Sequence, residues 1–130
     1  MQLRTFSLLV ICVVALAVPV LAHHSHGNYD ASVWTEFEGT VREVHLINPH
    51  SWIYMDIEDD AGESALWAME AAGPDTIRRN GVSSDDIKPG DTIQVRCHRQ
   101  RDGGPGCLLG FVTPLHGDAA RGDGVEMLWD

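Results

Sequence analysis

Apolar residues recur at every second position over several short stretches, which is the period of a β-strand with one buried face. The stretch from His50 to Glu58 is the clearest, because Ile53, Met55 and Ile57 alternate with polar or aromatic residues. The pattern recurs in four further stretches: 35–47, 64–70, 91–99 and 107–113. The chain therefore predicts five strands.

The first of these strands is expected to bend. Phe37, Gly39 and Val41 alternate with polar residues, but the apolar phase then slips by one position, to Val44 and Leu46. A slip of one residue is what a β-bulge produces, and a bulge bends the strand that carries it. A glycine within a strand also suits the close approach of another backbone segment.

Turn-forming residues separate the strands. The Asn48–Pro49 pair and the segment 59–62 end strands, and Gly73–Asp75 opens a short helix that stops near Gly81. The apolar tail 125–129 is a candidate edge strand. Three strands, one short helix and two strands predict an all-β fold, a small five-stranded OB-like Greek-key barrel with the helix between strands three and four. A small β-sandwich is the alternative.

The N-terminal residues have a different character. The apolar run Leu8–Val18 follows the basic residue Arg4 and leads to small or modest side chains ending at Ala22. This pattern is typical of a secretory signal peptide, and the run is too short for a membrane span. The mature chain is then expected to be periplasmic or secreted, to begin at His23 and to have no membrane span. The predicted organisation is a signal peptide (1–22), an extended histidine-rich segment (23–34) and a barrel domain (35–130).

Cysteine usage agrees with export. Cys12 leaves with the predicted signal peptide, and Cys97 and Cys107 flank the turn-rich segment 101–106. Two strands joined by that turn bring both sulfurs close in an oxidising compartment. We predict a disulfide that staples a hairpin and contributes roughly 3 kcal/mol in the loop-entropy picture. A dithiolate metal site is the alternative.

Charge and motifs restrict the classes of function. The formal net charge of −10 argues against nucleic acid and anionic membrane surfaces as partners, and it is compatible with cations or with simple solubility. The serines form no nucleophile elbow, and no glycine pattern fits a phosphate. We therefore expect a binding module and not an enzyme, with a metal ion, a small ligand or another envelope protein as partner.

The histidines are the strongest candidates for a chemical function. His23, His24 and His26 stand at the predicted new N-terminus, where the free amine of His23 has a pKa near ~8 and joins imidazoles as a metal donor. Such nitrogen donors suit Cu(II), Ni(II) or Zn(II), with copper the first candidate. His50, placed by Pro49 at the start of a strand, is a candidate further ligand. The alternatives are incidental polar histidines in a frayed terminus and a structural role for His50 in its turn.

The same strand face suggests other roles. Glu70 is a candidate metal ligand, a partner of a histidine ligand, or a backbone acceptor at a strand end. Trp52 and Tyr54 lie on the face of His50 and predict an alternative function, a metal-independent barrel that binds a small ligand or a protein there. Met55 is expected to fill the core and not to bind copper. A histidine-brace copper enzyme is a minor alternative.

Several segments together resemble the DUF6152 family of small exported bacterial proteins of unknown function. They are HHSHGNYD, GTVREVHLINPHSWIYMDI, ALWAME, a helix ending RRNGV, and KPGDTIQV before a DG turn. The resemblance covers nearly the whole predicted mature chain, with departures at Val82 and at His116–Asp118. It implies export and no particular activity.

Overall fold

The structure is a computed structural model that describes residues 26–130, so the predicted signal peptide, His23 and His24 lie outside the described residues. None of the helices in this range is long and apolar enough to cross a membrane. The elements are, in chain order, η1 (His26–Asn28), β1 (Thr35–His45), β2 (Ser51–Glu58), β3 (Ser64–Ala71), α2 (Pro74–Arg79), β4 (Thr92–Arg99), β5 (Gly106–Pro114), η2 (Ala119–Arg121) and β6 (Met127–Leu128).

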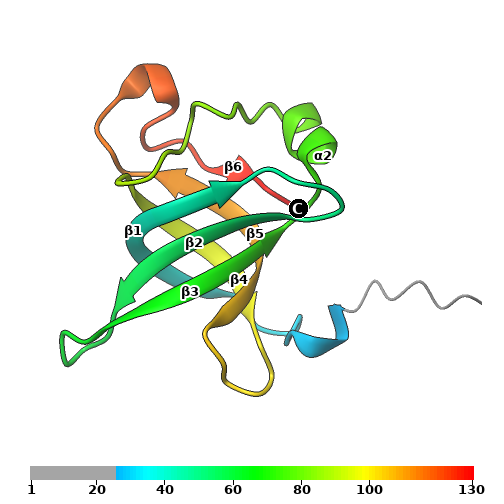
Figure 1. The fold of residues 1–130 in the computed structure, drawn as a ribbon, viewed down its shortest axis with the longest axis vertical. Coiled ribbons are helices and arrows are strands. Elements are labelled where there is room, and N and C mark those ends of the chain that lie inside the picture. The colour runs from blue at the N-terminus through cyan, green and yellow to red at the C-terminus, as the bar shows by residue number, and fades with distance from the viewer. Residues whose placement is uncertain (1–25) are drawn as a thin grey trace, which may run out of the picture.

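Five strands close into a barrel (Figure 1). β1 pairs antiparallel with β2 along its second half and with β4 along its first half. β2 continues to β3, and β4 continues to β5, again in antiparallel pairs. A parallel pairing of β3 with β5 joins the two edges, and the two-residue strand β6 adds to β5. The predicted OB-like barrel with one short helix between β3 and β4 is confirmed, and the sandwich alternative is wrong.

The barrel interior is filled by the alternating residues that the sequence singled out. Ile53, Met55 and Ile57 of β2 are buried, and so are Ile93 and Val95 of β4. Met55 is fully buried among apolar side chains, which confirms that it fills the core. Outward-facing residues alternate with these, as a closed sheet with one wet face requires.

The helix α2 covers one end of the barrel (Figure 1). It begins at Pro74, where a missing backbone N–H costs nothing, and its Ile77 side chain is buried in the core. The chain leaves the helix through Gly81, whose φ of 89° lies in the left-handed region that favours glycine. This is the predicted helix and the predicted stop.

The bulge in β1 is confirmed. The register of β1 against β2 shifts by one residue between Val41 and Glu43. Two residues earlier, Gly39 lies under the backbone of β2: a Cβ atom there would be 2.2 Å from the Asp56 carbonyl oxygen and 2.8 Å from the Met55 methyl group. Only glycine fits at this crossing, which gives the predicted close backbone approach.

The N-terminal segment departs from its expected shape. His26–Asn28 form a 3-10 turn, with the Tyr29 amide donating to the His26 carbonyl oxygen at 3.1 Å, so an extended 23–34 segment is wrong for this part. Directly after this turn the Tyr29 side chain is buried, with only 5% of the residue exposed. Trp34 is half-exposed, and its indole lies against Gly110 and His98.

Gly39→Ala is expected to lower the free energy of unfolding by about 1–3 kcal/mol, because the added methyl group forces backbone atoms apart in a packed crossing. Urea denaturation followed by circular dichroism measures the change. Gly27→Ala is the matched control, since nothing lies within 4 Å of its Cβ position. Equal stabilities of the two variants would contradict the close approach.

Candidate functional site

A glutamate joins two distant parts of the chain at the end of β3. Glu70 pairs across the sheet with Trp52, so its side chain lies beside the start of β2, where His50 stands. The Tyr29 hydroxyl donates to Glu70 Oε2 at 2.6 Å, and His50 Nδ1 is hydrogen bonded to Glu70 Oε1. One carboxylate thus binds a tyrosine from the N-terminal segment and a histidine from the β1–β2 loop.

The hydrogen-bonded residues Tyr29, Glu70 and His50, called here the Tyr29–Glu70–His50 chain, are partly buried. The side chain of Glu70 is 15% exposed and that of His50 is 32% exposed. Burial, the hydrogen bond to Glu70 and the negative charge of that carboxylate all raise the pKa of the Tyr29 hydroxyl above its ordinary value of 10.0. Tyr29 therefore remains a hydrogen-bond donor throughout the neutral range.

The arrangement leaves one nitrogen of His50 available. An ionised carboxylate can only accept hydrogen bonds, so His50 Nδ1 carries the proton that Glu70 binds. In the neutral imidazole Nε2 then has a free lone pair, and the ring is held in one orientation. Carboxylates orient metal-binding histidines in this way. The structure shows the contact of Glu70 with His50, and a role for the pair at a metal stays a prediction.

The β4–β5 hairpin holds the N-terminal segment against this site (Figure 1). The Asp30 amide donates to the Arg99 carbonyl oxygen, and the Arg101 amide donates to the Asn28 carbonyl oxygen, both at 2.9 Å. Tyr29 also forms an isolated β-bridge with Gln100. The segment is therefore fixed on both sides of the tyrosine whose hydroxyl reaches Glu70.

The predicted disulfide closes that hairpin. Cys97 and Cys107 are bonded, with 5.7 Å between their Cα atoms, and both are fully buried. Cys107 also pairs with Met69 across the parallel β3–β5 contact, one residue before Glu70. The disulfide prediction is confirmed, and the dithiolate alternative is wrong.

The predicted metal ligands are only partly placed. His26 lies on the exposed η1 turn, three residues before Tyr29, and His50 is bound to Glu70. His23 and His24 lie outside the described residues. Within 26–130, no three His, Cys, Asp or Glu side chains form a group that could hold a metal ion. The four-histidine set therefore stays a prediction.

The aromatic residues of β2 lie together, as the sequence predicted. The rings of Trp52 and Tyr54 are 6.3 Å apart between centroids and 16° from parallel. The His45 ring, from β1, meets Tyr54 edge-on at 5.3 Å. Trp52 pairs across the sheet with both His45 and Glu70, so this aromatic surface borders the Tyr29–Glu70–His50 chain.

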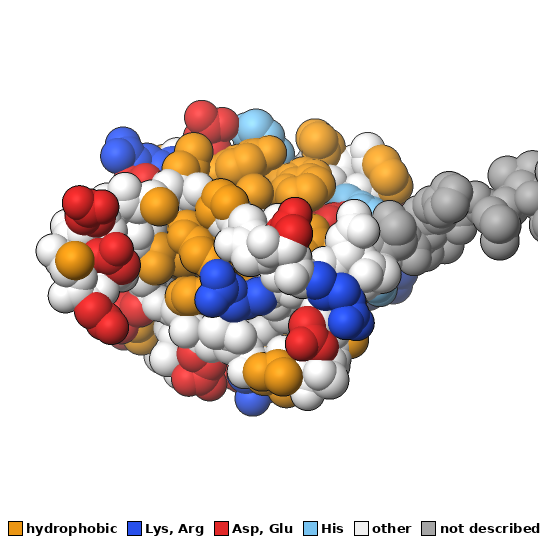
Figure 2. Space-filling view, turned by 90° about the horizontal axis from the view of Figure 1, so that it is seen from below, with side chains coloured by type: hydrophobic (Ala, Val, Ile, Leu, Met, Phe, Trp, Pro, Cys, Tyr) orange, Lys and Arg blue, Asp and Glu red, His pale blue; other side chains and the backbone are white. Residues whose placement is uncertain are grey.

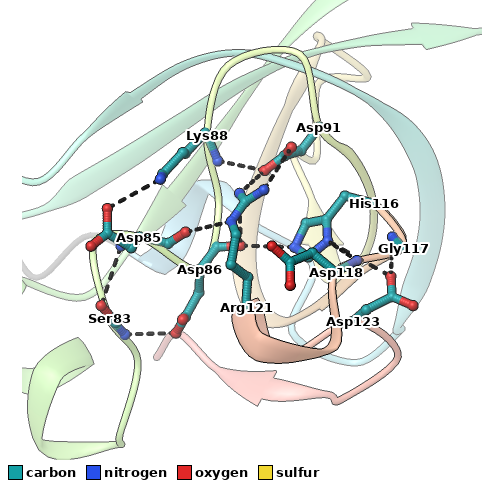
Figure 3. A network of polar contacts seen from close by, with 10 residues as sticks. All are labelled: Ser83, Asp85, Asp86, Lys88, Asp91, His116, Gly117, Asp118, Arg121 and Asp123. Carbon is teal, nitrogen blue, oxygen red and sulfur yellow. Dashed lines mark hydrogen bonds and ion pairs between the residues drawn. The ribbon is translucent and has the colours of Figure 1, made fainter.

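Sequence reasoning missed two features of the structure. It gave Tyr29 no chemical role, because a separation of 41 positions between Tyr29 and Glu70 leaves no local pattern that joins them. It also missed a polar network around Arg121, which Figure 3 shows between the loop before β4 and the turn before β6. The contact between Tyr29 and Glu70 depends on the closed barrel, so a local sequence pattern cannot predict it.

Arg121 is the centre of that network. Its Nε donates to the Asp85 carbonyl oxygen at 2.8 Å, one terminal nitrogen donates to the Asp86 carbonyl oxygen at 3.3 Å, and the guanidinium group binds the Asp91 carboxylate. His116 Nε2 also lies 3.1 Å from the Asp86 carbonyl oxygen. The guanidinium group thus binds three acceptors of the loop before β4, so this network clamps two loops together.

The ion pair between Arg121 and Asp91 determines how this network contributes to stability at low pH. Partial burial pushes the pKa of Asp91 upward, but hydrogen bonds from Arg121 and from the Lys88 amide outweigh it, so the pKa lies below its ordinary value of 3.8. A carboxyl group with a lowered pKa stabilises the fold above its ordinary value. That contribution is lost as the pH falls through the pKa of the folded protein.

Arg121→Gln is expected to lower the urea midpoint at pH 7, because the Asp91 carboxylate loses its partner. Below about pH 4 the difference from the wild type shrinks as Asp91 takes up a proton in both proteins. Arg78→Gln is the control, since its pair with Asp75 is largely exposed on both sides and contributes little. A difference that is independent of pH would contradict this account.

Tyr29→Phe is expected to cost about 1.5–3 kcal/mol at neutral pH, the usual value of a hydrogen bond to a charged group. The raised pKa of Tyr29 also has an alkaline consequence. Above pH 10 the unfolded chain ionises this tyrosine before the folded chain does, so the wild type loses stability as pH rises. The variant is expected to lose less over the same range, as chemical denaturation at pH 7 to 11 would show. Tyr54→Phe, on the outer face of β2, is the matched control.

Comparison with known proteins places the chain in a family but names no activity. No match was found among curated proteins or among solved structures. A family described as a family of unknown function, DUF6152, matches residues 10–109. This match spans the predicted export signal in part, all of β1 to β4 and the start of β5. The chain belongs to the DUF6152 family.

Proposed function

We propose that this protein is an exported, non-enzymatic module that binds a transition-metal ion, with copper the first candidate. The proposed ligands are His50 Nε2 and nitrogen donors from His23, His24 and His26. The observation that carries the proposal is the shared carboxylate of Glu70, which binds His50 Nδ1 and the Tyr29 hydroxyl together.

The donor chemistry of His50 supports this role. A histidine that donates one ring N–H to a carboxylate presents its other nitrogen as a more basic and better oriented ligand. Imidazole nitrogen suits copper, zinc and nickel, and the divalent copper ion binds such donors most tightly of the three. The His50 side chain is about one-third exposed, so the ring lies at the surface of the barrel and not in its core.

The position of the N-terminal segment supports a site built from two parts of the chain. Tyr29 is fixed to Glu70 and to the β4–β5 hairpin, and His26 is three residues before it. The histidines that the sequence places at 23, 24 and 26 are therefore tethered to the residue that orients His50. A short tether raises the effective concentration of these donors at His50.

Export would complete the ligand set. Cleavage after Ala22 would leave His23 with a free amine, which at neutral pH gives up its proton to a metal more readily than a lysine does. The net charge of −10 favours the approach of a cation. The Cys97–Cys107 disulfide also suits a compartment outside the cytosol.

The first experiment determines both the N-terminal residue of the exported protein and its binding of copper. The exported protein is purified without a tag, its mass is measured, and copper(II) is titrated by calorimetry. We expect a chain that starts at His23 and binds one copper ion. His50→Ala and the double variant His23→Ala/His24→Ala should each weaken binding by at least about tenfold, and Glu70→Gln by about 10–100-fold.

His45→Gln is the matched control, because its exposed imidazole is bound to Glu43 on the outer face of β1. Its affinity for copper should equal that of the wild type. A mature chain that binds no copper, or one whose affinity is unchanged in His50→Ala, would overturn the proposal. A chain that starts at another residue would remove the amine of His23 from the site.

A further inference from the structure

The side chain of His116 is only 4% exposed and takes no part in the proposed metal site. Other histidines differ in this respect. His26 and His45 are exposed, and Figure 2 shows histidine side chains at the surface of the molecule, in pale blue. A proton added to such a ring can be hydrogen bonded by water. A proton added to His116 must find its acceptor within the protein.

Both ring nitrogens of His116 lie against backbone groups, and the two groups are of opposite kinds. Nε2 is 3.1 Å from the Asp86 carbonyl oxygen, which can only accept a hydrogen bond, so Nε2 carries the proton. Nδ1 is 3.1 Å from the Asp118 amide nitrogen, which can only donate, so Nδ1 carries no proton. The two bonds together are compatible only with the neutral ring in this one tautomer.

The Asp118 amide stands at the start of the turn that carries Arg121. Asp118 is the N-cap of η2: its carboxylate accepts from the Ala120 amide at 3.0 Å, and its carbonyl oxygen accepts from the Arg121 amide at 3.0 Å. Arg121 in turn binds Asp91 in the loop before β4 (Figure 3). His116 therefore holds the residue on which the η2 side of this network is built.

A carboxylate also lies beside Nδ1 (Figure 3). Asp123 Oδ1 is 3.8 Å from Nδ1, which is too long for a hydrogen bond, and it accepts from the Gly117 amide at 2.7 Å. A carboxylate has about four acceptor positions, so Asp123 can bind a second donor and keep Gly117. A charge-assisted hydrogen bond is roughly twice as strong as a neutral one. Once Nδ1 is protonated, Asp123 is the better partner for it.

The other charged groups around His116 are held by protein groups. Asp91 lies close enough for a charge on His116 to act on its carboxylate, but the Arg121 guanidinium group binds it. Of the carboxylates in the network, Asp123 is the one that approaches a ring nitrogen of His116. The others are bound as follows: Asp85 to Lys88, Asp86 to the Ser83 amide, and Asp118 to the Ala120 amide.

We propose that His116 is a proton-operated switch, in which protonation of the ring makes Nδ1 exchange the Asp118 amide for the Asp123 carboxylate. The proton comes from solvent and adds to Nδ1, and no covalent bond between heavy atoms changes. The Asp118 N–H then loses its acceptor, so η2 and Arg121 are held less firmly against the loop before β4. Histidine ordinarily titrates between pH 5 and 8, so the switch operates in mildly acidic solution.

The test is an NMR titration of the full protein from pH 8 to pH 5, which follows the imidazole nitrogens of His116 and the backbone amide of Asp118 together. At the alkaline end we expect a neutral ring with its proton on Nε2. As Nδ1 takes up a proton, the protection of the Asp118 amide against hydrogen exchange should fall by at least about tenfold, with the same midpoint. A ring that stays neutral throughout, or an Asp118 amide that does not follow the ring, would overturn the proposal.

Two variants separate the exchange of partners from the simple titration of a buried ring. Asp123→Asn keeps an oxygen for the Gly117 amide but removes the charge, so the midpoint of the His116 titration should fall by about one pH unit. His116→Asn places an amide oxygen near the position of Nδ1 and does not titrate. The Asp118 amide of this variant should therefore keep its protection over the whole pH range.

Asp102→Asn is the matched control, because Asp102 also accepts from the backbone amide of a turn, that of Gly104 at 2.9 Å, but in the β4–β5 hairpin. Its His116 midpoint should equal that of the wild type. A wild-type midpoint in Asp123→Asn would overturn the proposal, and so would an acid-induced loss of Asp118 protection in His116→Asn. Each result can be read whether or not copper binds, because the residues of the switch are separate from the proposed metal ligands.

Discussion

The parallel contact between β3 and β5 is the constraint on which the remaining structure depends. It consists of three residue pairs, Ala68 with Gly106, Met69 with Cys107, and Glu70 with Leu108. Without it the sheet would have two open edges, and with it the strands enclose one core. The same short contact also carries the two groups of chemical interest, a half-cystine and the carboxylate of Glu70.

The position of the candidate site follows from this closure. The disulfide ties β4 to β5 on one side of the contact, and the end of their hairpin offers the backbone groups to which residues 28–30 bond. Tyr29 then meets Glu70, and Glu70 meets His50 from the loop before β2. The N-terminal segment, two loops and the strand contact thus converge on one carboxylate. Trp52 and Tyr54 extend from this point along the outside of β2.

Local patterns in the sequence were sufficient to predict the strands, the bulge and the helix, because each depends on neighbours within a few residues. Alternation identified the buried face of β2, the phase slip in β1 identified the bulge, and Pro74 and Gly81 bounded α2. The disulfide was predictable for the same reason, since only ten positions separate its cysteines.

Contacts between distant residues were not predictable in this way. The sequence could suggest Glu70 as the partner of His50, but the approach of Tyr29 depends on the 3-10 turn η1 and on the β4–β5 hairpin to which residues 28–30 bond. The clamp around Arg121 likewise joins two loops, with Asp91 30 positions away. Neither contact has a period or a motif, because its partners meet only through the tertiary fold.

The closing contact has a consequence for how the protein is assembled. The β1–β2–β3 meander and the β4–β5 hairpin each join neighbouring stretches of chain, so they can form early and separately. The β3–β5 contact instead joins residues almost 40 positions apart, and the entropy of closing such a loop must be offset before any contact is gained. Tyr29, His50 and Glu70 come together only after that step. A partly folded chain, however much of its sheet has formed, therefore lacks the complete Tyr29–Glu70–His50 arrangement. The proposed metal site would exist only in the finished barrel.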